Sequence, residues 1–157
     1  MDGVKQFVNK KFDSSLKRLI NDLHDNFKLS NKAIFVFMAG YGLRYQEATE
    51  KHINDSFDID GPEWRDDTDK DYDVAVDILI ERYSSLHGLE FKDVRCSIDL
   101  LKQVTDGLMK IANAVGRFWL DEDLEPFKNG VTRDEKANFI RLVSGYFKQL
   151  NESAEPF

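Results

Sequence analysis

The sequence has very little cysteine, proline and glycine. Cys96 is the only cysteine, so no disulfide can form within the chain, and a zinc site would need other types of ligand. Three prolines and nine glycines in 157 residues argue against a loop-rich or low-complexity chain. With 41% hydrophobic and 32% charged residues, the composition is that of a globular protein. The length predicts one domain with a buried core.

Long apolar runs are also missing. The longest mostly apolar stretch, 33–43, is too short to cross a bilayer. The first five residues lack the apolar stretch of a signal peptide. We therefore expect a cytoplasmic protein that does not associate with a membrane.

Catalytic motifs are absent as well. There is no Gly-x-Ser-x-Gly elbow, no phosphate-binding loop and no pair of histidines at metal-ligand spacing. His24, His52 and His87 are interpreted as surface or helix-end residues, and Cys96 as a core residue. The acids near residues 69–77 are interpreted as a solvated helix start without a shifted pKa. We expect no catalytic residue, no cofactor and no metal, and we predict that the chain is not an enzyme.

The charge is unevenly distributed. The formal net charge is −7, yet residues 55–77 contain ten acids and two bases and carry −8, which leaves +1 for the remainder. Within this acidic segment, Ser56 to Gly61 resembles half of an EF-hand loop. The position of a bidentate Glu holds Asp67, however, and this disfavours calcium.

Hydrophobic periodicity predicts helices along most of the chain. We expect a first helix over 4–27, with an interruption at Asp13–Ser14, and a second that begins after an N-cap at Ser30 and continues through Ala48. Gly40 and Gly42 either permit close helix contact or end that helix early. The later helices are expected to begin at Thr68 or Asp69 and end at Gly88, to follow Asp93 as far as Trp119, and to run from Thr132 to Leu150.

These elements predict an all-α fold, a bundle of five or six helices in one domain over 1–150. Residues 49–68 are expected to form a long acidic loop, and residues 121–131 a second loop. The tail 151–157 is expected to fray.

One stretch resembles a known family. Phe27, Phe35 and Phe37, followed by Ala39 and Gly42, form a pattern similar to that of small accessory proteins found beside DNA phosphorothioation (Dnd) and related phage-defence gene clusters. The pair Ala112–Asn113 before Gly116 is similar to another part of that pattern. The resemblance implies an accessory role in a defence assembly and brings no enzymatic site.

Two surfaces are predicted to contact a partner. The first is the aromatic side of the second helix, with Phe35, Phe37 and Tyr41, and the second is the acidic segment, with Asp66, Asp67 and Asp69. The leading hypothesis is a protein–protein interaction module that binds another subunit, with homo-oligomerisation as a variant. The alternative is a nucleic-acid-binding protein that uses the basic first twenty residues, or a DNA mimic that uses the acidic segment.

Overall fold

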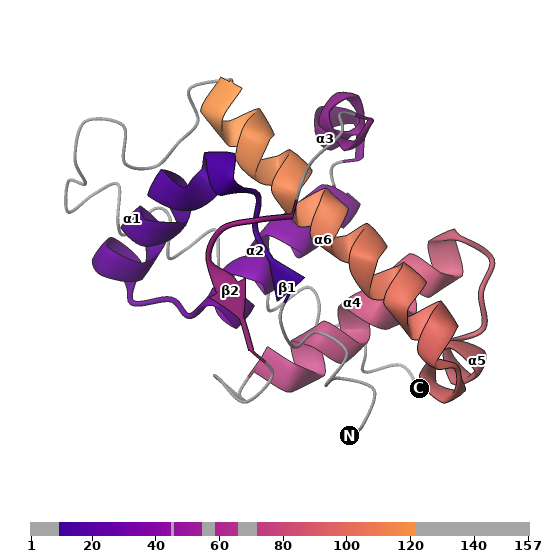
Figure 1. Cartoon of the computed structure of the whole chain (residues 1–157). Coiled ribbons are helices and arrows are strands. Elements are labelled where there is room, and N and C mark those ends of the chain that lie inside the picture. The colour runs from indigo at the N-terminus through magenta and orange to yellow at the C-terminus, as the bar shows by residue number, and fades with distance from the viewer. Residues whose placement is uncertain (1–9, 45, 55–58, 66–71, 122–157) are drawn as a thin grey trace.

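The computed structural model describes residues 10–44, 46–54, 59–65 and 72–121. Of these residues, 78% are helical, and they form six α-helices and one two-stranded sheet (Figure 1). The predicted all-α fold is confirmed. In order, the elements are β1 (Lys10–Lys11), a 3₁₀ turn at Ser14–Leu16, α1 (Lys17–Phe27), α2 (Asn31–Arg44), α3 (Gln46–Ile53), β2 (Glu63–Trp64), α4 (Asp73–Leu86), α5 (Phe91–Cys96) and α6 (Ile98–Asp121).

The longest helix, α6, crosses α2 and α4 and packs against both (Figure 1). Apolar residues recur along one face of α6 at helical spacing. The buried residues on this face include Leu101, Val104, Leu108 and Val115. Helix α2 lies beneath it and is buried from Lys32 through Gly40. The core therefore forms where α6 covers α2, and the other helices surround this pair.

The start of α2 follows the prediction. The Ser30 hydroxyl oxygen accepts a hydrogen bond from the Ala33 amide at 3.1 Å, as an N-cap does. Gly42 stays within the helix and lies against Ile111 and Val115 of α6. Of the two roles predicted for the glycines, close helix contact is the one observed at Gly42.

The first helix is shorter than predicted, because Lys10 and Lys11 form a strand. They pair in antiparallel register with Trp64 and Glu63, respectively. The Asp13 carboxylate then accepts a hydrogen bond from the Ser15 amide at 3.1 Å, and the helical turns begin. The predicted interruption at Asp13–Ser14 is thus the actual helix start. Residues 4–9 of the predicted helix lie outside the described residues.

Three other predicted boundaries were wrong. The loop over 49–68 contains the end of α3 and all of β2. The third helix begins at Asp73, and the predicted cap at 68–71 lies outside the described residues. The fourth helix is divided into α5 and α6, because Ser97 is extended (φ −123°, ψ 117°) and its hydroxyl accepts a hydrogen bond from the Leu100 amide. The loop at 121–131, apart from Asp121, the helix from Thr132 and the tail also lie outside the described residues.

A substitution at Gly42 tests the packing of α2 on α6. An alanine Cβ there would overlap Ile111 Cγ2 and lie 3.1 Å from Val115 Cγ2. We expect G42A to lower the free energy of unfolding by about 1–2 kcal/mol, because overpacking outweighs the gain in helix propensity. The measurement is denaturant unfolding. I111A removes the overlapping methyl group, so the two changes should compensate in G42A/I111A, and simple additivity would contradict the packing described here.

Candidate functional site

The predicted aromatic surface on α2 is largely internal. Phe35 is 0% exposed and Phe37 is 4% exposed, while Tyr41 is half-buried. The Phe35 ring stacks on Trp64, with centroids 4.8 Å apart and planes inclined at 20°. Because Trp64 belongs to the acidic segment, this stack joins that segment to α2.

The acidic segment is therefore joined to the helical body. Of its predicted contact residues, Asp66, Asp67 and Asp69 lie outside the described residues. The described residues on either side of them include Trp64, at the end of β2, and Asp73, at the start of α4. Both contact α2, so this helix is in contact with the segment on both sides of 66–71.

Lys32 makes the second of these contacts. Its ammonium nitrogen lies 2.8 Å from Asp73 Oδ1, and its side chain is completely buried while that of Asp73 is 39% exposed. The same nitrogen lies 6.0 Å from the centroid of the Trp64 ring, within the range of a cation–π interaction. Lys32 thus contacts residues on both sides of 66–71. Sequence analysis missed it, because a lysine in the first turn of a helix is normally exposed.

A second ion pair joins α4 to α5. Arg95 Nη1 donates to Asp77 Oδ1 at 2.6 Å, and both side chains are at most one-quarter exposed. Burial raises the pKa of Asp77 above its ordinary value of 3.8, Arg95 opposes this shift, and the Asp73 carboxylate adds to it. The prediction of a solvated helix start without a shifted pKa was therefore wrong for Asp77.

The raised pKa of Asp77 predicts a pH effect on stability. The folded state binds this proton more tightly than the unfolded state, in which the pKa is close to 3.8. Protonation of Asp77 therefore stabilises the folded state fully below about pH 3.8. This stabilisation is lost as the pH rises through the higher pKa that Asp77 has in the folded state. We expect the melting temperature of wild type minus that of D77N to increase on acidification from about pH 7 to about pH 3.5. A constant difference would contradict the raised pKa.

A cavity of about 310 Å³ lies where α1 ends, α2 begins and β2 passes. Its lining residues are His24, Leu29, Ser30, Asn31, Glu63 and Arg65. The Asn31 amide nitrogen donates to the Glu63 carbonyl, so Asn31 Oδ1 must accept from His24 Nε2, at 2.5 Å. These bonds give the cavity a fixed polar wall and join β2 to the α1–α2 corner.

His52 was expected at a surface or helix end, and it does lie in the last turn of α3. It is buried there, and its ring and that of Phe118 meet edge to face. Cys96 was expected in the core and is exposed at the end of α5. Among the described residues, no group of three histidine, cysteine or acidic side chains is placed to hold a metal ion.

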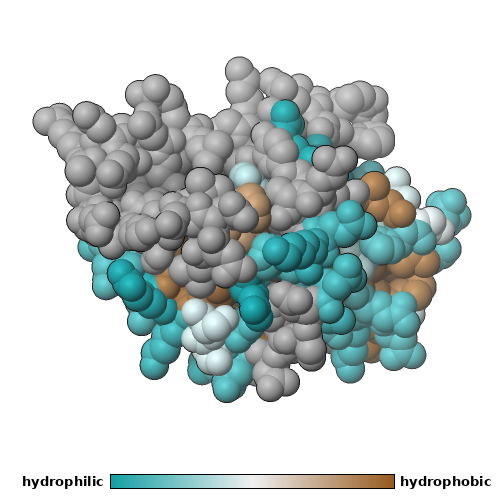
Figure 2. Space-filling model, turned by 90° about the horizontal axis from the view of Figure 1, so that it is seen from above, coloured by the Kyte–Doolittle hydropathy of each residue, from teal (hydrophilic) through white to brown (hydrophobic). Residues whose placement is uncertain are grey.

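On the face seen in Figure 2, the described residues are mainly hydrophilic, with hydrophobic side chains gathered in a few places. The exposed large hydrophobic residues of the described part are Val74 (65%), Leu86 (57%) and Ile98 (63%). All three are aliphatic, whereas the sequence suggested aromatic contact residues. No described helix has the length and apolar character needed to span a membrane.

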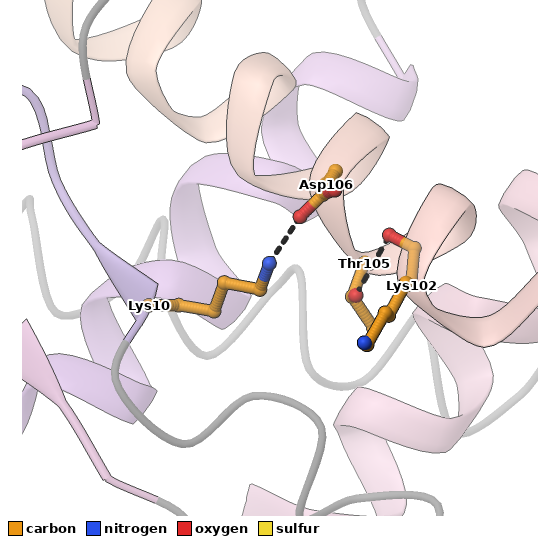
Figure 3. A network of polar contacts seen from close by, with 4 residues as sticks. All are labelled: Lys10, Lys102, Thr105 and Asp106. Carbon is orange, nitrogen blue, oxygen red and sulfur yellow. Dashed lines mark hydrogen bonds and ion pairs between the residues drawn. The ribbon is translucent and has the colours of Figure 1, made fainter. Parts of the chain in front are cut away.

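Basic residues near the N-terminus are partly neutralised. Lys10 of β1 forms an ion pair with Asp106 of α6 (Figure 3). In the neighbouring turn of α6, the Thr105 hydroxyl donates to the Lys102 carbonyl. Lys10 and Lys11, which were predicted to lie on a basic helix that binds nucleic acid, form a strand instead.

Comparisons of this chain with protein-family models, curated proteins and solved structures found no match.

Proposed function

We propose that this chain is a non-catalytic helical interaction module, an accessory subunit of an intracellular assembly, and that it binds a basic protein surface through the acidic segment. The observation that carries this proposal is that the most acidic segment of the chain is also held against a buried helix. A segment of net charge −8 contacts one buried helix at Trp64 and at Asp73. A charged segment attached on both sides loses less conformational entropy on binding than a free tail.

The other predicted surface receives less support. Phe35 and Phe37 are committed to the core, which leaves the half-buried Tyr41 as the accessible aromatic of that set. We therefore favour the acidic segment as the contact surface. The resemblance to accessory proteins of phage-defence gene clusters supports a role of the assembly in antiviral defence.

Binding of a basic peptide tests this proposal directly. The probe is a fluorescein-labelled helical peptide of lysine and alanine, with its lysines on one face, and its binding is followed by polarisation at increasing salt. We expect binding that weakens as salt rises, because charge attraction is screened. Failure of the wild-type protein to bind this peptide at low salt would refute the proposal.

The alternative, a nucleic-acid-binding protein, predicts the opposite selectivity. A gel-shift assay at low salt with single-stranded and double-stranded DNA measures it. The proposed module should leave both DNAs unshifted, whereas a shift that disappears at moderate salt would favour phosphate contacts.

A further inference from the structure

Lys32 occupies an unfavourable place for a cation. It is the second residue of α2, where the partial positive charge of a helix N-terminus disfavours a cation. Its side chain is 0% exposed, so the ammonium has also lost its hydration. A methionine of similar length would avoid both costs. Stability alone therefore does not explain a lysine at this position.

The contacts of Lys32 suggest a different role. Its ammonium reaches Asp73 on one side and the face of Trp64 on the other. Among the described acids of residues 55–77, Asp73 has its Oδ1 atom 2.8 Å from the Lys32 ammonium nitrogen. A buried ammonium needs charged or polar partners within hydrogen-bonding distance, whereas an apolar contact is non-directional and tolerates neighbouring residues in its place.

We propose that Lys32 is a positioning residue for the acidic segment. Through its buried ammonium it fixes the places of Trp64 and Asp73 on α2, and thereby the two described points at which the acidic segment contacts this helix. This inference rests on the proposed function, and it names Lys32 as the residue that holds the acidic segment in place for binding.

The test replaces the charged pair by an apolar pair, K32M/D73L. K32M removes the cost of burying a cation, whereas D73L places an apolar side chain at a position that is 39% exposed; because these effects oppose each other, the melting temperature should stay within a few degrees of wild type. Hydrogen exchange should become about tenfold faster in peptides covering 63–65 and 73–80, and stay unchanged in α6. The affinity for the helical lysine peptide should fall about tenfold.

Unchanged exchange and unchanged affinity at an unchanged melting temperature would overturn this inference. If K32M/D73L does not fold, K32M alone serves, because the Asp73 side chain is 39% exposed and can be hydrated. The conservative variant D73E keeps the charge and should retain near-wild-type affinity. Failure of the wild-type protein to bind the peptide would refute the proposed function instead, while the exchange result would still report on Lys32.

Discussion

Replacing Trp64 by alanine should lower the free energy of unfolding by about 3–5 kcal/mol, the range for a large aromatic residue removed from a core. Trp64 is 0% exposed and stacks on Phe35, which is equally buried. Removing the Trp64 ring would therefore leave an empty space next to α2. For a protein of this size, the melting temperature should fall by on the order of 10 °C. Thermal and denaturant unfolding, followed by circular dichroism, measure the change.

The matched control is W64F, which retains a ring beside Phe35. We expect it to cost about 1–2 kcal/mol, because most of the stacking area remains. If W64A were as stable as the wild type, Trp64 would not be part of the core. The acidic segment would then lack the attachment on which the proposed function depends.

The second large effect concerns binding. Neutralising three acids in D66N/D67N/D69N should weaken binding of the helical lysine peptide by about tenfold. Each exposed ion pair contributes up to about 1 kcal/mol, and three pairs at roughly half that value give this factor. We expect the free energy of unfolding to stay unchanged, because this variant retains both described contacts with α2, at Trp64 and at Asp73.

A variant with the same change in net charge separates position from total charge. D25N/E50Q/E90Q neutralises three acids that are exposed on α1, on α3 and just before α5. Its affinity for the lysine peptide should remain within about twofold of wild type at moderate salt, because distant charges are screened. Equal losses in the two variants would show that net charge alone attracts the peptide.

Sequence patterns predicted the elements whose signals are local. The N-cap of α2 at Ser30 follows from a residue type with a specific hydrogen-bonding role. The end of α4 follows from Gly88, which has φ +71° and so adopts the left-handed conformation that glycine tolerates best. The long apolar periodicity of α6 likewise predicted its existence, although not the separation of α5.

Elements that depend on tertiary contacts were missed. The strands β1 and β2 are two residues long, too short to show an alternating pattern, and they exist because the chain brings 10–11 beside 63–64. Trp64 lies in a segment rich in acids, whose composition favours exposure to solvent, yet its ring packs on Phe35.

The candidate site was predicted only in part. The sequence indicated the acidic segment by its charge and α2 by its apolar character, but not that the two are in contact. Lys32 carries no signal by itself, since burial of a lysine depends on a partner 41 residues away. Such pairing between distant residues is not encoded in local periodicity.

The most direct test of the central claim is an affinity pull-down of the tagged protein from its native cells, with and without nuclease. We expect a stoichiometric protein partner that resists nuclease, is recovered with D25N/E50Q/E90Q and is lost with D66N/D67N/D69N. Recovery that disappears with nuclease, or a partner retained equally by both variants, would contradict binding of a basic protein through the acidic segment.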